Sequence, residues 1–198
     1  MILIYDFLIL IFAYLIGSLP VGYWITKSKD GADIRKFGSG NIGATNVGRK
    51  FGVKYFFLVM SLDALKAFLL MWLVVELSSL DLLDPFIVFV AIVALLVGNG
   101  YSIFLNFSGG KGIATSLGIL MVLSPKIALG MVLLWCATFI FTKNAGWASI
   151  VTIFMLMIVA VTIVHQNIFL CFSFTFISLW CLFRHKQNIL DWFNKKSL

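Results

Sequence analysis

Residues whose types suit phosphate binding gather in the segment 37–52, which reads FGSGNIGATNVGRKFG. Its glycines allow backbone N–H groups to approach a ligand closely, and its Asn, Ser and Thr side chains add short-range hydrogen-bond donors. Arg49 adds a planar cation that can bind two phosphate oxygens at once. A second patch, Gly109-Gly110-Lys111-Gly112, repeats this chemistry later in the chain. The sequence therefore predicts that two glycine-rich loops build one anion site.

Two better-known glycine motifs do not fit these segments. Gly38, Gly40 and Gly43 have the G-x-G-x-x-G spacing of a dinucleotide site, but that site requires a preceding strand within a βαβ unit. The second patch is no P-loop, because Gly112 follows Lys111 where Ser or Thr is required. Residue types alone leave two readings open for segment 37–52, a phosphate-binding loop and a flexible polar linker.

The elements that position these loops are set by a very apolar composition. Of 198 residues, 62% are hydrophobic and only 12% are charged, against roughly a quarter charged in a typical soluble domain. A chain of this length cannot hide that much apolar surface from water unless lipid covers part of it. The sequence therefore predicts an all-α integral membrane protein. Its three cysteines lie in apolar runs and form no metal-binding motif.

Seven apolar runs separated by polar breaks predict seven transmembrane helices in a single membrane domain, 1–198. They cover about 2–25, 55–77, 85–98, 112–123, 127–141, 146–164 and 168–183. Several are shorter than the ~20 residues that a spanning helix needs. The third and fourth are the shortest, so we expect both helices to extend into the segment between them.

The basic residues predict the orientation. Thirteen of the fifteen Lys and Arg residues fall on one side of the predicted spans, within the loops 27–54 and 99–111, the turn at Lys143 and the C-terminal segment 184–198. The positive-inside rule makes that side the cytoplasm, with the N-terminus outside. Both glycine-rich loops and the C-terminal segment then share one membrane face. The net charge of +7 is thus explained by topology, and no nucleic-acid-binding motif accompanies it.

Other polar residues have ordinary interpretations beside functional ones. Asp63 and Lys66 lie one helical turn apart inside a span, which favours an ion pair that supports the site from behind. His185 and Asn188 would share one helical face after the last span. Ser149, read alone, is helix filler near the same membrane face.

Five segments taken together resemble the PlsY family of bacterial acyl-phosphate:glycerol-3-phosphate acyltransferases. They read GSLPVGY from 17, GSGNIGATNVGR from 38, DALK from 63, GGKGIATSLG from 109 and RHKQNI from 184. The resemblance runs over nearly the whole chain in the same order. It implies a seven-span enzyme of the bacterial inner membrane, with its active site facing the cytoplasm. It also implies that glycerol 3-phosphate takes an acyl group from acyl phosphate, giving lysophosphatidic acid and phosphate, with membrane lipid as surroundings and no metal, cofactor or obligatory protein partner.

The resemblance also carries over site residues by position. The catalytic candidates are Ser39, Asn41, Lys111 and His185, and the substrate-binding candidates are Gly38, Gly40, Gly43, Thr45, Asn46, Arg49, Gly109, Gly110, Ser149 and Asn188. Arg49 and Lys111 would bind phosphate, Ser39 and Asn41 would hydrogen-bond a hydroxyl or oxyanion, and His185 would serve in either role. The chain departs from the family pattern at Asn99, Ser108 and Gly146, among other positions.

Two other functions stay open at this level. A transporter or exchanger of a phosphorylated metabolite also uses broken helices and glycine-lined anion sites. Against it, every polar cluster opens to one predicted face, and the two halves show no inverted repeat. A catalytically impaired relative is the other alternative, which the departures from the pattern permit.

Overall fold

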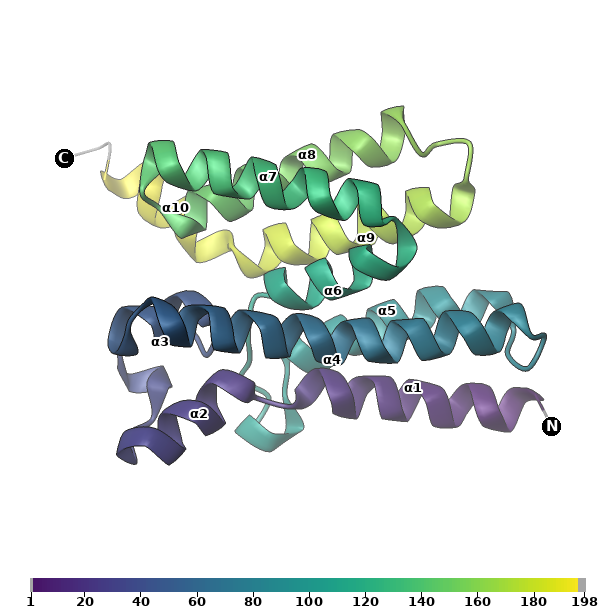
Figure 1. Ribbon diagram of the computed structural model, residues 1–198, viewed down its shortest axis with the longest axis horizontal. Helices are drawn as coiled ribbons and strands as arrows, with labels where there is room; N and C mark the ends of the chain where they lie inside the picture. The colour runs from purple at the N-terminus through teal and green to yellow at the C-terminus, as the bar shows by residue number, and fades with distance from the viewer. Residues whose placement is uncertain (1, 196–198) are drawn as a thin grey trace. The chain divides into compact units, whose positions relative to one another are not determined.

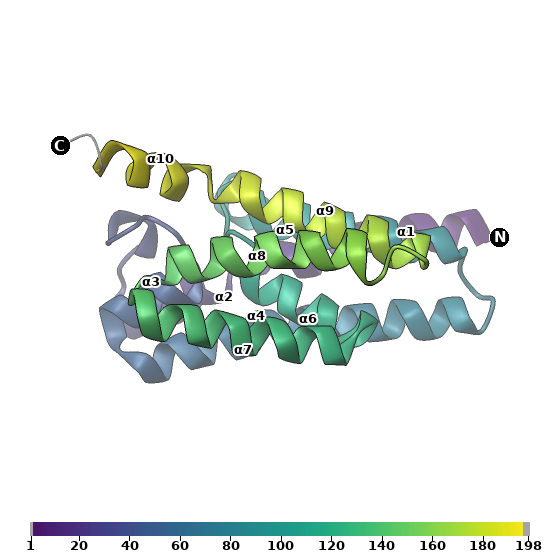
Figure 2. The same cartoon turned by 90° about the horizontal axis from the view of Figure 1, so that it is seen from above.

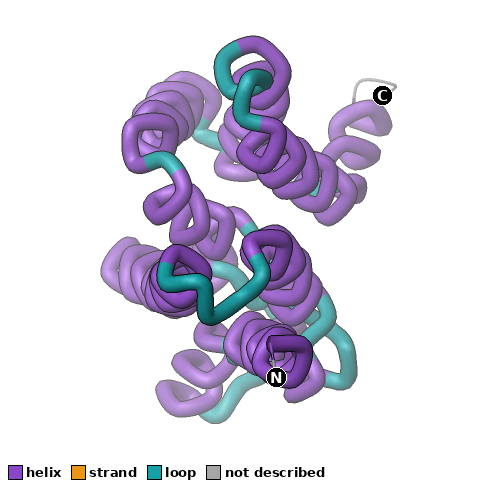
Figure 3. Tube along the Cα trace, turned by 90° about the vertical axis from the view of Figure 1, so that its right-hand side faces the viewer, coloured by secondary structure: helices purple, strands orange, loops and turns teal. Residues whose placement is uncertain are grey.

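The computed structural model describes the backbone of residues 2–195 and the side chains of residues 4–190, and this part of the chain consists of helices joined by loops, with one isolated β-bridge between Ser102 and Ser108 (Figure 3). The chain forms two compact units, residues 1–122 and 123–198. The prediction of one membrane domain stays a prediction. Of the predicted C-terminal segment 184–198, residues 196–198 lie outside the described part.

The first unit contains six α-helices and two short 3₁₀ helices in its described residues (Figure 1). They are α1 (Ile2–Ser18), α2 (Val21–Asp30), η1 (Ile34–Lys36), α3 (Ala44–Phe51), α4 (Val53–Ser79), α5 (Pro85–Gly100), η2 (Ile103–Leu105) and α6 (Ile113–Leu123, whose last residue falls at the boundary). The second unit contains α7 (Pro125–Thr142), α8 (Ala145–Thr162), α9 (Ile168–Arg184) and α10 (Lys186–Lys195). Within it, α8 packs against both α7 and α9 (Figure 2).

Seven apolar helical segments correspond to the seven predicted spans. Four are long and apolar enough to cross a membrane, namely Ile4–Asp30 taken as one segment, α4, α7 and α8, and three shorter ones are α5, α6 and α9. An integral membrane all-α protein is therefore confirmed, whereas the seven-span count and the outside N-terminus stay predictions.

Glycines let α1 and α5 approach closely, because a Cβ on Gly17 or Gly98 would collide with a backbone carbonyl of the other helix. Small residues at such contacts are typical of helices packed in membranes.

Two predicted boundaries are wrong. The first span does not run unbroken to residue 25, because Pro20 has no N–H and the helix stops at Ser18 before α2 restarts at Val21. The third span extends only two residues into the segment between the third and fourth spans, and the fourth does not extend into it, since α5 ends at Gly100 and α6 begins at Ile113. Residues 101–112 instead form a compact loop built around η2.

Candidate functional site

The first glycine-rich segment is an ordered loop whose centre is the Asn46 side chain. Asn46 is buried, and its Nδ2 lies 2.9 Å from both Phe37 O and Asn41 O and 3.3 Å from Ile34 O. Its Oδ1 accepts a hydrogen bond from the Ser39 N–H at 3.1 Å. The flexible-linker reading is therefore wrong, because one amide fixes the backbone from residue 34 to residue 41.

The glycines of this loop are used for conformation and for space. Gly38 and Gly40 have φ of +53° and +69°, in the left-handed region that favours glycine. A Cβ on Gly38 would also collide with Asn46 Oδ1. Asn41 Oδ1 accepts from the Gly43 N–H at 2.8 Å, just before α3 begins. The loop thus leaves Ser39 exposed beside a helix start, where unpaired N–H groups favour an anion.

The cations of this segment differ in their partners. Lys50 forms an ion pair with Asp30. Arg49, next to it on α3, is exposed, and its side chain forms no hydrogen bond or ion pair with any other described residue. Thr45, in the first turn of α3, is half-buried. Arg49 is therefore the cation of this loop that remains available to a ligand.

The two glycine-rich segments share one hydrophobic cluster. It consists of Ile34 and Ile42 from the first loop, Val47 and Val59 from α3 and α4, and Leu105 from η2. Leu105 precedes the Gly109–Gly112 patch in the compact loop 101–112. The loop 27–54 and the loop that carries the second patch therefore pack together within the first unit, and a single anion site formed by segment 37–52 and Gly109–Gly112 stays a prediction.

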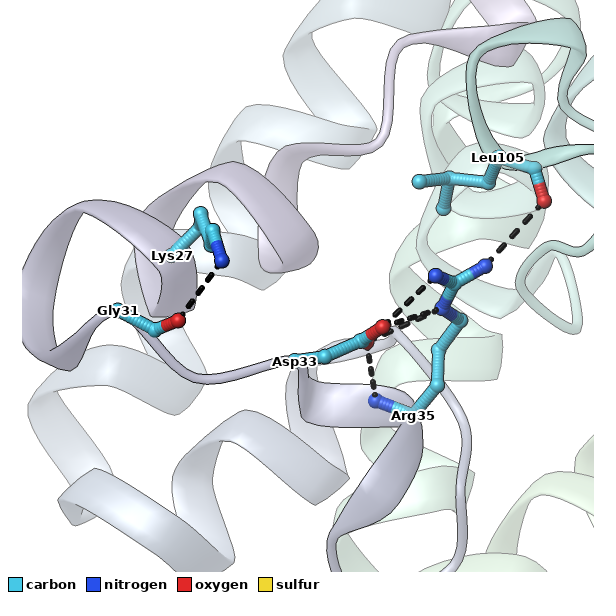
Figure 4. A network of polar contacts seen from close by, with 5 residues as sticks. All are labelled: Lys27, Gly31, Asp33, Arg35 and Leu105. Atoms are coloured by element: carbon cyan, nitrogen blue, oxygen red, sulfur yellow. Dashed lines mark hydrogen bonds and ion pairs between the residues drawn. The ribbon is translucent and has the colours of Figure 1, made fainter.

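Arg35 links the same two segments by polar contacts, as Figure 4 shows. Its Nη1 donates to Leu105 O at 3.3 Å, and its Nη2 forms an ion pair with Asp33 Oδ2 at 2.7 Å. The hydrogen bond from Arg35 holds the pKa of the Asp33 carboxyl below its ordinary value, so the pair stays ionised at neutral pH. Nothing in the sequence singled out Arg35 from the other basic residues of the loop.

The second glycine patch is pressed against the end of α5. The Gly110 N–H donates to Asn99 O at 2.8 Å, and a Cβ on Gly109 would collide with the Asn99 and Gly100 carbonyls. Gly112, with φ of +88°, turns the chain into α6. Lys111 is half-buried between these fixed glycines. Asn99, one of the departures from the family pattern, is thus a backbone partner of the patch.

Asp63 and Lys66 form the predicted ion pair, with Lys66 Nζ 2.7 Å from Asp63 Oδ1. Lys66 also donates to Leu19 O at 2.7 Å and to Gly17 O at 3.3 Å. These carbonyls lie at the break between α1 and α2, where Pro20 removes a helical N–H donor. The pair thus stabilises the break that lets α2 leave the line of α1 and reach the first glycine-rich loop.

We expect Lys66→Met to lower the free energy of unfolding by about 2 kcal/mol, because it leaves Asp63 and two carbonyls without their donor. Thermal unfolding in detergent measures the change. Lys54→Met, an exposed lysine on the same helix, is the matched control. Equal unfolding temperatures for the two variants would show that the Lys66 contacts contribute nothing.

The second unit contains the remaining predicted residues. Ser149 is buried, donates to Ala145 O at 2.8 Å and accepts from the Trp135 indole N–H at 3.1 Å. Trp135 was not predicted, because it lies in an apolar run and its partner is on the next helix. Ser149 is therefore held in one orientation rather than serving as plain helix filler.

His185 ends α9, with its Nδ1 2.7 Å from Cys181 O. Since a carbonyl only accepts, Nδ1 carries the proton, and Nε2 is the acceptor in the neutral ring. Asn188 follows on α10, and a Cβ on Gly146 would lie 2.6 Å from its Nδ2. The departure at Gly146 thus has a physical reason, since glycine leaves room for the Asn188 amide beside the start of α8.

Comparison with known proteins gives consistent matches over most of the chain. The family model described as glycerol-3-phosphate acyltransferase matches residues 7–195. A relative of that name from Aquifex aeolicus is 38% identical over 184 residues, covering 91% of this chain and 92% of the relative. Another from Fusobacterium nucleatum is 36% identical over 183 residues, covering 92% of each chain.

Two crystal structures of PlsY, an integral membrane glycerol 3-phosphate acyltransferase, are also similar to this chain. The glycerol 3-phosphate form has a TM-score of 0.85 at 34% identity, covering 96% of this chain and 92% of that chain. The lysophosphatidic acid form has a TM-score of 0.82 at 33% identity, with the same coverage.

Proposed function

Since this chain belongs to the PlsY family of glycerol-3-phosphate acyltransferases, we propose that it transfers an acyl group to the 1-hydroxyl of glycerol 3-phosphate. The product is lysophosphatidic acid, a precursor of membrane phospholipid. The observation that carries this proposal is that the two loops carrying the glycine-rich segments share one hydrophobic cluster, with the Arg49 side chain exposed and unpaired in the first of them. The family's structures with glycerol 3-phosphate and with lysophosphatidic acid support the same substrate and product.

The proposed acyl donor is acyl phosphate. The substrate hydroxyl attacks the acyl carbon, the bond from that carbon to the phosphate oxygen breaks, and the hydroxyl proton leaves with inorganic phosphate or solvent. An acyl phosphate is already activated, so an especially strong protein nucleophile is not required. Positioning the hydroxyl and stabilising charge on the oxyanion and the leaving phosphate supply the catalysis.

The residues divide between binding and positioning. Two phosphate groups that repel each other must be held together, which requires cations and N–H donors. In the proposal, Arg49, Lys111 and the backbone N–H groups of the two glycine-rich segments meet this need. Ser39 and Asn41 hydrogen-bond the hydroxyl or oxyanion, and Asn46 positions them through the loop backbone. Ser149, His185 and Asn188 are the contribution proposed for the second unit.

The proposal places the protein in the bacterial inner membrane with both glycine-rich segments facing the cytoplasm. The excess of Lys and Arg in the segments on that side supports this orientation. Glycerol 3-phosphate then arrives from water, while the acyl donor and the product stay dissolved in lipid. The proposal needs no metal, cofactor or protein partner.

Purified protein given palmitoyl phosphate and radiolabelled glycerol 3-phosphate tests the proposal. Formation of labelled lysophosphatidic acid with equimolar phosphate release, dependent on both substrates, is the expected result. Palmitoyl-coenzyme A in place of palmitoyl phosphate is the donor control and should give no product. In liposomes without donor, counterflow of labelled glycerol 3-phosphate would instead identify a transporter, and neither activity would identify an impaired relative.

Arg49→Ala should raise the KM for glycerol 3-phosphate about 10- to 100-fold and change kcat less, because one charge-assisted contact to phosphate is lost. The unfolding temperature should stay unchanged, since Arg49 forms no bond within the described chain. Steady-state kinetics with varied glycerol 3-phosphate measure the effect, and Lys54→Ala is the control for loss of an exposed charge. An unchanged KM would refute the assignment of Arg49 to the phosphate.

A further inference from the structure

The loop that follows α5 starts at a depth where lipid is expected. α5 has 16 residues and is about 24 Å long, less than the ~30 Å hydrocarbon layer of a bilayer. α4, which leads into α5 through a short turn, has 27 residues and is about 40 Å long. Figure 1 shows α4 continuing past the level at which α1 gives way to α2. α5 therefore ends beside the middle of α4 and not beside the N-terminal end of α4 at Val53.

Contacts of the loop support the same depth. Ser102 Oγ donates to Ser18 O at 2.6 Å, which places the start of the loop at the break between α1 and α2. Lys66 reaches that break through Leu19 O, and Lys66 lies about 20 Å along α4 from its end at Ser79. The start of the loop is thus nearer to the middle of the hydrocarbon layer than a loop between two full spans would be.

The backbone of this loop is satisfied from within the protein. The Leu105 and Phe107 N–H groups donate to Ser102 O at 3.1 and 2.8 Å, and the Ser108 N–H donates to Leu105 O at 3.2 Å. Arg35 donates to the Leu105 carbonyl, as described above. Non-helical backbone is tolerated at membrane depth only where its polar groups are paired or face water. The N–H groups of Leu105, Phe107 and Ser108 and the carbonyls of Ser102 and Leu105 meet the first condition.

Large apolar side chains point outward from the same loop. Ile103, Phe104 and Phe107 are 49%, 50% and 62% exposed, and Trp24 of α2 is 48% exposed with its ring 6.3 Å from that of Phe104. Phe107 has φ of +59°, a conformation disfavoured for a bulky residue. An exposed group of large apolar side chains marks an interaction site with protein or membrane. These four residues are called the aromatic loop patch below.

We propose that residues 101–108 form a re-entrant loop within the membrane and that the aromatic loop patch binds the acyl chains of bilayer lipids. These exposed fractions match that of Leu69, which is 51% exposed within the apolar helix α4. The exposed Lys27 and Lys36 lie on the neighbouring α2 and η1, as expected where lipid tails meet anionic headgroups. Trp24 on the same side is typical of this interface. The inference concerns contact with lipid and does not depend on the reaction.

Spin-label accessibility in liposomes of phosphatidylethanolamine and phosphatidylglycerol tests the proposal. Phe104→Cys and Phe107→Cys are labelled separately with a nitroxide in the full chain carrying Cys136→Ser and Cys171→Ser, since Cys181 is buried. Leu69→Cys on α4 is the control for lipid and Lys36→Cys on η1 the control for water. Collision rates with oxygen, which concentrates in lipid, and with a polar nickel chelate, which stays in water, are compared at each position.

Both loop labels should resemble the Leu69 control, with oxygen collisions several-fold favoured over nickel collisions. Nickel access equal to that of the Lys36 control would overturn the proposal, because the loop would then face water. Should Phe104→Cys or Phe107→Cys fail to fold, Ile103→Cys gives the same comparison from the same loop.

Discussion

Replacing Lys111 with alanine should lower kcat/KM for lysophosphatidic acid formation by about 10³-fold while the protein remains folded. Lys111 follows two glycines that are fixed against Asn99 and Gly100, so its backbone is held in place before the substrates arrive. Removing one preorganised donor to a developing negative charge costs about 10²- to 10³-fold. Steady-state kinetics with palmitoyl phosphate measure the loss.

Lys36→Ala is the matched control, because Lys36 is an exposed lysine in the first loop. It should retain nearly full activity. A Lys111→Ala variant with activity within a few-fold of Lys36→Ala would contradict the role given to the second glycine patch.

Replacing Asn46 with alanine should lower the free energy of unfolding by about 4 kcal/mol and activity by about 10²-fold. The change leaves three carbonyls and the Ser39 N–H without their partner, at about 1–3 kcal/mol for each buried group that finds no other. The freed loop then no longer holds its N–H groups toward a ligand. Chemical unfolding in mild detergent and kinetics on the same preparation measure both effects.

Asn106→Gly is the control, since Asn106 is exposed and its left-handed backbone suits glycine. It should unfold like the parent protein. An Asn46→Ala variant that keeps the parent's stability would show that the loop is held by other contacts.

The apolar helices could be predicted from sequence because hydropathy is a local property of each run. The break at Pro20 could not, although proline is visible in the sequence. Membrane helices accept proline where another group satisfies the freed carbonyls. Here that group is Lys66, which lies far along the chain and reaches Leu19 O only in the folded protein.

The expectation that α5 and α6 extend into their loop failed for a related reason. It assumed that each helix alone must cross the hydrocarbon layer. A tertiary hydrogen bond from Arg35 satisfies Leu105 O, and one from Ser102 Oγ to Ser18 O fixes the loop against the end of α1, so α5 can stop short. Helix length therefore depends on partners that no single window of sequence contains.

At the site, residue types were informative and individual contacts were not. The residue types of segment 37–52 left a phosphate-binding loop and a flexible linker open, and the structure shows an ordered loop. The central position of Asn46 and the bridge by Arg35 depend on which carbonyls the fold brings near them. The fit of Asn188 beside Gly146 likewise joins residues on different helices.

Sided labelling of the two glycine-rich segments tests the central claim most directly. Ser39→Cys, at an exposed position, and Lys111→Cys, at a half-buried position in the second glycine patch, are treated with a membrane-impermeant maleimide in inverted and in right-side-out membrane vesicles, in the background lacking Cys136 and Cys171. The account predicts that both cysteines react in inverted vesicles and neither in right-side-out ones. Reaction of the two from opposite faces, or of both from outside, would contradict a single cytoplasmic site.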